Sequence, residues 1–347
     1  MSSTTGLGKT VLVTGGSGYV AAEVINAFLS RGYNIKTTVR NEAAAEKIKK
    51  SHSQHIDRIS FAYVKDLQIP GGHDDAVKGV DGVVHTASPF VLEVKSNLHD
   101  LLEPAKNGTV EVLKSVQKSN PDVKRVLVTS SFASLVDLTQ GARPGYAYTE
   151  KDWNPTSWEV AASQDTSGVV SYCASKGFAE KAAFDFVADN KPNFDITSIC
   201  PPMVYGPSSV GFPGFAKLNT SSADIYRFMS GSLKEVPETG FYGFVDVRDL
   251  AEAHVRAYES EAAAGQRYLT VSAGYTYQQV ADIIRAGFPA KRDLVPEGNV
   301  NEPFPDVYKM DNTKIKTELG MEFRPLKTTI VDMVKQFQGY ENAAVEA

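Results

Sequence analysis

The feature that most constrains the fold is a short apolar run that leads directly into a glycine-rich loop. Residues 10–14 read Thr-Val-Leu-Val-Thr, and Gly15-Gly16-Ser17-Gly18 follow before an amphipathic stretch that starts at Tyr19. Glycines permit a tight turn in which a phosphate group approaches backbone N–H groups at the positive end of a helix. A glycine turn can also simply join a strand to a helix, but its place after the first strand favours a dinucleotide-binding loop.

Short β-branched runs alternate with amphipathic stretches through the first half of the 347-residue chain. This alternation is typical of βαβ units, and several runs are apolar throughout, as strands covered on both faces require. The expected strands are residues 10–14, 35–39, 59–64, 82–85, 125–129 and 195–200. The expected helices are residues 19–30, 42–51, 74–80, 98–119 and 171–188.

The regular alternation stops near residue 200, where prolines and glycines become frequent. We expect residues 1–200 to form mainly a Rossmann-type domain and residues 201–347 mainly a substrate-binding lobe. Within this second part, about 240–260 should return to the Rossmann domain, and a further strand is expected near 267–271. The predicted fold class is therefore α/β, a doubly wound parallel sheet with a smaller C-terminal lobe.

Composition favours a small-molecule substrate. The net charge of −5 gives no electrostatic reason to expect nucleic acid or an anionic membrane as partner, and no run of membrane-spanning length is present. Two cysteines do not make a disulfide framework, so we expect a cytoplasmic protein. The six histidines form no metal-ligand pattern, and a monomer or a homodimer remains open.

The end of the second strand indicates which nicotinamide cofactor fits. NAD-specific folds place an acidic residue there for the ribose 2′-hydroxyl, whereas an arginine suits the 2′-phosphate of NADPH. This chain has Arg40 at that position, with Glu42 just past the strand end. Lys47 either adds a second charge for the phosphate or is an ordinary surface lysine. The sequence therefore predicts NADPH/NADP as cofactor.

Further cofactor contacts are expected at the ends of the other strands. Asp66 follows the third strand, where it either accepts a hydrogen bond from adenine or caps its own loop. Small side chains close the fourth strand and let a cofactor pass close by. The expected contacts at these strand ends are Thr14, Gly15, Ser17, Gly18, Tyr19, Val20, Arg40, Lys47, Asp66, Leu67, Thr86, Ala87 and Ser88.

Tyr172 and Lys176 form a Y-x-x-x-K pattern on a predicted helix, so they share one face, a turn apart. A phenol is a poor acid–base group at neutral pH, and a neighbouring ammonium favours the phenolate. Lys176 can also bind the nicotinamide ribose. Ser131 ends the fifth strand, where it either orients a substrate oxygen or caps the next turn, and Ser130 is its rival.

In combination, these motifs resemble those of the extended short-chain dehydrogenases/reductases. The nearest resemblance is to fungal NADPH-dependent methylglyoxal and ketone reductases and to plant dihydroflavonol and cinnamoyl-CoA reductases. The residues that carry it span nearly the whole chain and are 14–21, Arg40, 85–90, 129–131, 153–155, Trp158, 172–176 and 246–249.

The resemblance implies catalytic roles for Ser131, for Tyr172 as proton donor and for Lys176 as its electrostatic partner. It also implies that Val204 lies beside the nicotinamide carboxamide. Further cofactor contacts follow from it at Thr129, Tyr172, Lys176, Pro201 and Val204. The fungal reductases carry a lysine four residues after the arginine, where this chain has Ala44, so the NADPH preference depends on Arg40 and Lys47.

The implied reaction is reduction of an aldehyde or ketone by hydride transfer. Four aromatic residues are candidates either for an apolar substrate pocket or for the core: Phe90, Phe132, Phe212 and Tyr242. A nucleotide-sugar epimerase or dehydratase shares the fold, but residues 131–134 supply no carboxylate for a dehydratase. A regulator that only senses NADPH is a third possibility, and such proteins often lose the tyrosine or the lysine.

Overall fold

The computed structural model describes residues 5–88, 94–211, 214–215 and 218–346. The strands are β1 (Thr10–Thr14), β2 (Asn34–Val39), β3 (Ile59–Tyr63), β4 (Gly82–His85), β5 (Arg125–Thr129), β6 (Ala147–Tyr148), β7 (Asp195–Cys200), β8 (Met203–Tyr205), β9 (Gly243–Asp246), β10 (Arg267–Leu269), β11 (Ala273–Gly274) and β12 (Lys309–Met310). The α-helices are α1 (Tyr19–Ser30), α2 (Glu42–Ser51), α3 (Glu103–Ser119), α4 (Trp158–Ala162), α5 (Gly168–Asn190), α6 (Thr220–Met229), α7 (Val247–Glu259), α8 (Tyr277–Gly287), α9 (Thr313–Leu319) and α10 (Leu326–Glu346).

A seven-stranded sheet forms the centre of the molecule, in the order β10-β7-β5-β4-β1-β2-β3. All neighbouring strands in it pair in parallel. The chain runs outward from β1 to β3 in one direction and from β4 to β10 in the other, so the order reverses between β1 and β4. Ligands of such sheets bind beyond the carboxyl ends of the strands at this reversal. The predicted doubly wound α/β class is confirmed.

Helices cover both faces of this sheet, because alternate residues of each strand point to opposite sides. Val11 and Val13 of β1 belong to the apolar cluster that includes α1, α2 and α7. Leu12, which lies between them, belongs to the cluster that includes α3 and α5. All three side chains are fully buried, which explains why the strand reads as a continuous apolar run.

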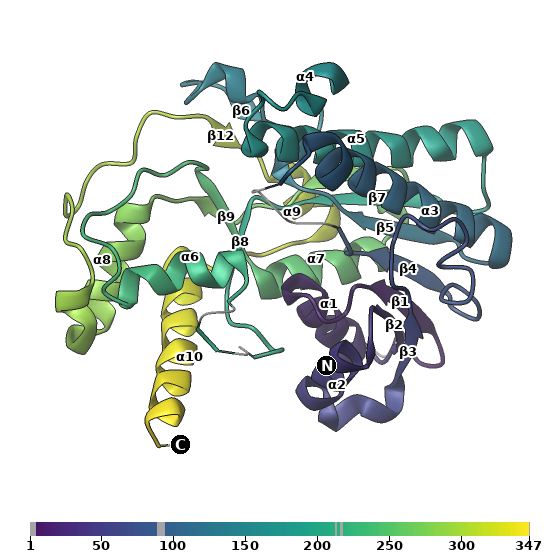
Figure 1. Ribbon diagram of the computed structural model, residues 1–347, viewed down its shortest axis with the longest axis horizontal. Helices are drawn as coiled ribbons and strands as arrows, with labels where there is room; N and C mark the ends of the chain where they lie inside the picture. Colours follow the sequence, from purple (N-terminus) through teal and green to yellow (C-terminus); the bar gives the residue numbers. More distant parts are fainter. Residues whose placement is uncertain (1–4, 89–93, 212–213, 216–217, 347) are drawn as a thin grey trace.

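The C-terminal lobe has its own core. Figure 1 shows α6, α8 and α10 grouped on the left of the view, apart from β1–β5 on the right. Buried side chains such as Phe228, Phe244 and Phe337 join these helices to the small sheet β11-β9-β8. α7 instead packs against α1 beneath the large sheet. The boundary near residue 200 remains a prediction. In the described ranges, no helix has both the length and the apolar composition needed to cross a membrane.

One predicted helix is wrong: residues 74–80 form hydrogen-bonded turns. Gly79 adopts a φ of +70°, which ends a helix. The side-chain amide of Asn120 donates to the carbonyl oxygens of Val77 and Val80, at 2.7 and 2.8 Å. These long-range bonds satisfy carbonyl oxygens at the end of the segment and hold it in the turn conformation. The other predicted helices are present, and a short π-helical turn (Asn97–Leu102) leads into α3.

Candidate active site

The glycine loop lies where the strand order reverses. Gly15 follows β1 with a φ of +72°, and a Cβ atom there would lie 3.0 Å from the Cβ atom of Ala87. A side chain at this position would therefore be strained and crowded. α1 begins after Gly18 without a side-chain cap and without an acidic residue in its first turn. The positive end of the helix is thus open to an anion such as a pyrophosphate.

The neighbouring loop residues hold this turn against the rest of the molecule. The Ser17 carbonyl oxygen accepts a hydrogen bond from the ammonium group of Lys47 at 3.3 Å. The Tyr19 hydroxyl donates to the carbonyl oxygen of Gly206 at 2.7 Å, which links α1 to the start of the C-terminal lobe. Val20 packs against the apolar cluster that includes α1, α2 and α7. Lys47 therefore lies at the glycine loop, and partial burial lowers its pKa.

Thr14 joins the ends of β1 and β4. Its hydroxyl oxygen accepts hydrogen bonds from the N–H groups of Thr86 and Ala87, both at 3.1 Å. It therefore donates its own proton to Nδ1 of His85, 2.9 Å away, which assigns the Nε2–H tautomer to that ring. Burial lowers the pKa of His85 to about 3, so the ring is neutral at physiological pH.

Arg40 directly follows β2 and is exposed. It makes no hydrogen bond or ion pair with the residues that the structure describes. The nearby carboxylate of Glu42 is already engaged by the Tyr63 hydroxyl and by the ammonium of Lys49 at 3.1 Å. A guanidinium without a counter-ion at the end of the second strand fits the 2′-phosphate of NADPH, and the acidic neighbour does not compete for it.

Several other residues expected at the cofactor already have partners in the protein. The exposed Asp66 carboxylate accepts the N–H of Gln68 at 2.9 Å, which is the loop-capping contact. The Thr129 hydroxyl lies 2.8 Å from Nε2 of His254. The Pro201 carbonyl oxygen accepts the N–H of Phe132 at 2.8 Å.

Two further residues expected at the cofactor, Leu67 and Val204, pack against the apolar core. Leu67 packs beside α3. A Cβ atom on Gly108 of this helix would lie 3.2 Å from the Cβ atom of Leu67. Val204 lies in β8, paired with Val245, and packs against the core beneath the sheet.

Ser131, Tyr172 and Lys176 come together at the carboxyl edge of the sheet. Ser131 follows β5, and its hydroxyl oxygen caps the next turn by accepting the N–H of Ala133 at 3.1 Å. The same hydroxyl lies close enough to the Tyr172 hydroxyl on α5 to lower the pKa of that phenol. The Lys176 ammonium lies 5.5 Å from the centre of the Tyr172 ring and donates to the Ser88 hydroxyl at 2.7 Å. Ser88 follows β4, so the cluster connects the ends of two neighbouring strands with one helix.

Burial shifts the pKa values of both ionisable groups in this cluster. It raises the pKa of Tyr172, and the hydrogen bond with Ser131 acts in the opposite direction. It lowers the pKa of Lys176 to about 8, because the ammonium is taken out of water. At neutral pH the phenol therefore holds its proton, while most of the lysine carries its charge.

The two adjacent serines point in different directions. The Ser130 side chain is buried, and its hydroxyl donates to Glu180 at 2.7 Å. Ser131 is half-buried and contacts Tyr172. Glu180 was missed in the sequence, although it lies four residues after Lys176 and thus on the same helix face.

The four aromatic candidates have different surroundings. Phe132 is 1% exposed and packs against Tyr148 and Tyr308 at ring-centre distances of 5.2 and 5.7 Å, so it is a core residue. Tyr242 is half-buried and belongs to the same aromatic cluster as Tyr172. Phe90 and Phe212 lie outside the described residues.

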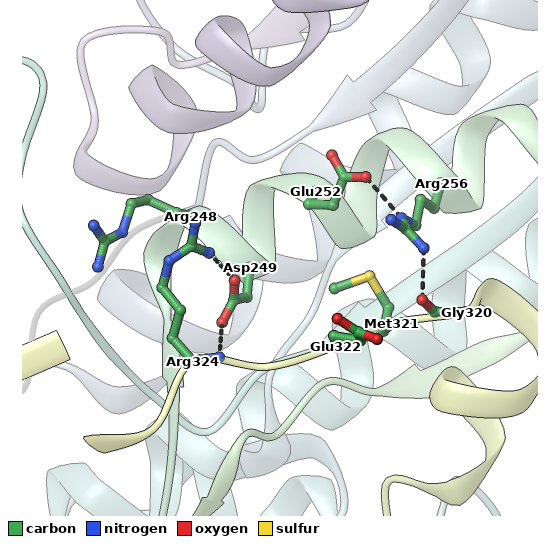
Figure 2. Close-up of a pocket in the computed structure, with 8 residues that line it drawn as sticks. All are labelled: Arg248, Asp249, Glu252, Arg256, Gly320, Met321, Glu322 and Arg324. Carbon is green, nitrogen blue, oxygen red and sulfur yellow. Dashed lines mark hydrogen bonds and ion pairs between the residues drawn. The ribbon is translucent and has the colours of Figure 1, made fainter. Parts of the chain in front are cut away.

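A charged pocket of about 510 Å³ lies elsewhere, along α7 (Figure 2). Its lining residues are Arg248, Asp249, Glu252, Arg256, Gly320, Met321, Glu322 and Arg324. Three arginines and three carboxylates balance one another there, and Figure 2 shows Arg324 paired with Asp249 and Arg256 with Glu252. This pocket shares no lining residue with the cluster of Ser88, Ser131, Tyr172 and Lys176, which we call the strand-end cluster. A much narrower cavity adjoins Lys176, His85 and Ser130.

The fold defines this protein as one of the Rossmann-type class. The sequence profile of the NAD dependent epimerase/dehydratase family matches residues 11–270, so the chain belongs to that family of extended short-chain dehydrogenases/reductases. The family resemblance found in the sequence is confirmed.

Solved and curated relatives cover almost all of the chain. Ketoreductase azaE of Aspergillus niger is 38% identical, over 94% of this chain and 97% of the relative. The cinnamoyl-CoA reductase CAD2 of Medicago truncatula is 34% identical, over 97% of this chain and 98% of the relative. The crystal structure of yeast methylglyoxal/isovaleraldehyde reductase Gre2 complexed with NADPH has a TM-score of 0.89 at 32% identity, over 96% of this chain and 99% of that chain.

Proposed function

We propose that this protein is an NADPH-dependent carbonyl reductase that converts aldehydes or ketones to alcohols. The observation that carries the proposal is the meeting of Ser131, Tyr172 and Lys176 at the same sheet edge as the glycine loop. The relatives support the reaction class, because they include a ketoreductase, a cinnamoyl-CoA reductase and a methylglyoxal reductase.

The residues at the strand ends fit NADPH. Gly15 leaves room for a pyrophosphate beside an uncapped helix end, and Arg40 offers an unpaired guanidinium for the 2′-phosphate. Lys47 lies at the glycine loop, where its ammonium donates to the Ser17 carbonyl oxygen. When bound, NADPH supplies the hydride that the carbonyl carbon accepts.

Tyr172 acts as the general acid in this proposal. Its raised pKa keeps the phenol protonated at neutral pH, so that it can donate its proton to the carbonyl oxygen. The Ser131 hydroxyl orients that oxygen and hydrogen-bonds to the phenolate left after proton transfer. The Lys176 ammonium, with a pKa of about 8, stabilises the phenolate electrostatically.

The epimerase or dehydratase alternative has weaker support. A dehydratase needs a carboxylate that can exchange protons with substrate beside the serine. Glu180 is the carboxylate close to Ser130, but its side chain is fully buried and paired with Arg267 at 2.7 Å. Such a group is held as an anion within the protein and has no access to a substrate. The Tyr172 and Lys176 pair also argues against a regulator without turnover.

The test is consumption of NADPH by the purified protein, followed through its absorbance. The panel should include simple aldehydes, α-dicarbonyl compounds, ketoesters and aryl ketones. We expect turnover with at least one class and little with NADH. Tight binding of NADPH without turnover on the whole panel would contradict the reductase proposal and favour the regulator.

A further inference from the structure

Glu180 is a buried carboxylate one helical turn beyond Lys176 on α5. Its side chain has no exposed area. It accepts hydrogen bonds from the Ser130 hydroxyl at 2.7 Å and from the Ser134 hydroxyl. Burial alone would raise the pKa of Glu180, but Arg267 and the two serines lower it below its ordinary value, so it remains an anion.

Arg267 comes from β10, at the edge of the large sheet. Its Nε donates to Glu180 at 2.7 Å, and its Nη2 donates to Glu180 at 3.2 Å and to Ser134 at 3.3 Å. Its Nη1 donates to the carbonyl oxygens of Glu150 and Asp152, both at 2.7 Å. Every donor nitrogen of this guanidinium has a partner, and its orientation is therefore fixed.

The Trp153-Asn154 pair, which sequence reasoning noted only as a family motif, completes this unit. The Trp153 ring stacks on the Arg267 guanidinium at 3.6 Å. The Asn154 side-chain amide donates to the carbonyl oxygens of Ala133 and Val136, at 3.3 and 3.0 Å. Through Asn154 the motif thus holds the turn that follows Ser131, by binding two of its carbonyl oxygens.

The hydroxyl contacts of Glu180 converge on residues that flank Ser131. Ser130 precedes it, and Ser134 lies at the end of the following 3₁₀ turn (η3, Phe132–Ser134), with its hydroxyl 2.8 Å from the Ser131 carbonyl oxygen. Glu180 binds both flanking hydroxyls and stands on the helix that carries Tyr172. The turn that carries the serine and the helix that carries the tyrosine are therefore connected through the carboxylate.

We propose that Glu180 and Arg267 are positioning residues that hold Ser131 opposite Tyr172, and this proposal rests on the reductase activity proposed above. A buried ion pair is weak evidence for stability, because desolvation of the two charges offsets their attraction. An apolar pair could fill the same space. It could not fix two hydroxyl groups, whereas a carboxylate with four acceptor directions can.

Ser130→Ala and Ser134→Ala test the link, since each removes one hydroxyl that Glu180 binds and leaves Ser131 in place. We expect kcat to fall about 10- to 100-fold, as for a small misplacement of a catalytic group. The Kd for NADPH should change by less than about threefold. The alkaline limb of the kcat pH profile should keep its position, because the unchanged Lys176, with its pKa of about 8, sets that limb.

Thr197→Val is the matched control. Thr197 is buried on β7, and its hydroxyl donates to the Ala263 carbonyl oxygen at 2.6 Å, away from the turn. This variant should lose a comparable amount of thermal stability and keep the wild-type kcat and pH profile. If Ser130→Ala and Ser134→Ala behave in the same way as the control, Glu180 only stabilises the fold and the proposal is wrong.

The double variant Glu180→Gln/Arg267→Met removes both buried charges. Its Tm should fall by less than that of either single variant, because neither charge is left unpaired and only the Glu150 and Asp152 carbonyl oxygens lose a donor. Its kcat should remain about 10-fold or more below wild type, because a neutral amide oxygen holds the two serine hydroxyls with weaker hydrogen bonds than the charged carboxylate does. A stable double variant with wild-type kcat would contradict the positioning role.

Amide hydrogen exchange over residues 131–136 gives a readout that does not need turnover. Exchange should be faster in Ser130→Ala than in the wild type and unchanged in Thr197→Val. If the wild type reduces no carbonyl compound, the proposed function fails, but faster exchange would still support the link from Glu180 to the turn. If the wild type is active and Ser130→Ala shows wild-type exchange and turnover, only the positioning role fails.

Discussion

The strand-end cluster around Tyr172 and the charged pocket along α7 are both rich in ionisable groups, but they differ in their exposure to solvent. Tyr172 and Lys176 lie in a closely packed edge of the sheet, and burial is the largest cause of both their pKa shifts. Arg256 and Arg324 in the pocket have side chains that are 36% and 42% exposed, and each is paired with a carboxylate.

The contrast shows that volume alone is a poor guide to function. The pocket in Figure 2 is large, but its charges cancel, and solvent weakens each pair. The strand-end cluster encloses little space, yet burial holds its phenol protonated beside a lysine whose pKa is near 8. Shifted pKa values of this kind are typical of reacting groups. If the contrast is correct, variants at the two regions should differ by orders of magnitude in their effect on turnover.

Tyr172→Phe should have the largest effect. It removes the proposed proton donor and leaves the ring in place, so kcat should fall about 10³-fold. The Kd for NADPH, measured by fluorescence titration, should change by less than about threefold. Tyr268→Phe is the control, because it removes a hydroxyl bonded to Glu318 at the far edge of the sheet. Near-normal turnover of Tyr172→Phe would show that the acid lies elsewhere.

Arg40→Asp should have the next largest effect, on cofactor choice. Loss of charged hydrogen bonds to the 2′-phosphate, with a new repulsion, should raise the KM for NADPH about 100-fold. The KM for NADH should change by no more than about threefold. Lys50→Asp is the control, because it makes the same charge change at an exposed position of α2. Equal increases for both cofactors, or an equal effect of Lys50→Asp, would remove Arg40 from the phosphate site.

Groups buried near the carboxyl edge of the sheet should also dominate the dependence of the unfolding free energy on acid pH. Burial lowers the pKa of His254, which is bonded to Thr129, to about 4, compared with about 6.5 in the unfolded chain. Between these values the unfolded state binds the extra proton, so stability is lost as pH falls from about 6.5 towards 4. At pH 5.5 His254 alone should cost about 1.2 kcal/mol relative to pH 7.

Urea unfolding of the wild type and of His254→Leu at neutral pH and at about pH 5.5 checks this expectation. The variant should be less stable at neutral pH, because it loses the bonds to Thr129 and Leu250. Its further loss on acidification should be smaller than that of the wild type. Parallel losses in both proteins would mean that His254 does not titrate in this range.

The sheet could be predicted from the sequence because burial on both faces leaves an unmistakable local pattern. The apolar runs of β1, β4 and β5 and the glycines after β1 need no information from distant residues. Residues 74–80 failed because their backbone is held by Asn120, which lies 43 positions from Val77. A local helical pattern cannot reveal such a partner.

The candidate site divides in the same way. The spacing of Tyr172 and Lys176 and the strand-end place of Ser131 are local features, and the structure brings these residues together. The pairing of Glu180 with Arg267 joins residues 87 positions apart and leaves no trace in either local sequence. Phe132 illustrates the opposite difficulty, because an aromatic residue at a strand end reads the same whether it lines a pocket or, as here, lies in the core.

Arg324→Met, in the charged pocket, should have the smallest effect. The side chain of Arg324 is 42% exposed while that of Asp249 is 4% exposed, so solvent screens the pair from one side and its loss should cost about 1 kcal/mol. Asp249 keeps the hydrogen bond from the backbone N–H of residue 324, 2.6 Å away, so the carboxylate is not left without a donor. Denaturant unfolding should detect this small loss of stability. The kcat and the KM values for NADPH and NADH should stay within about twofold of wild type. A fall in turnover comparable to that of Tyr172→Phe, without a matching loss of stability, would mean that the pocket takes part in the reaction and that exposure does not separate the two regions.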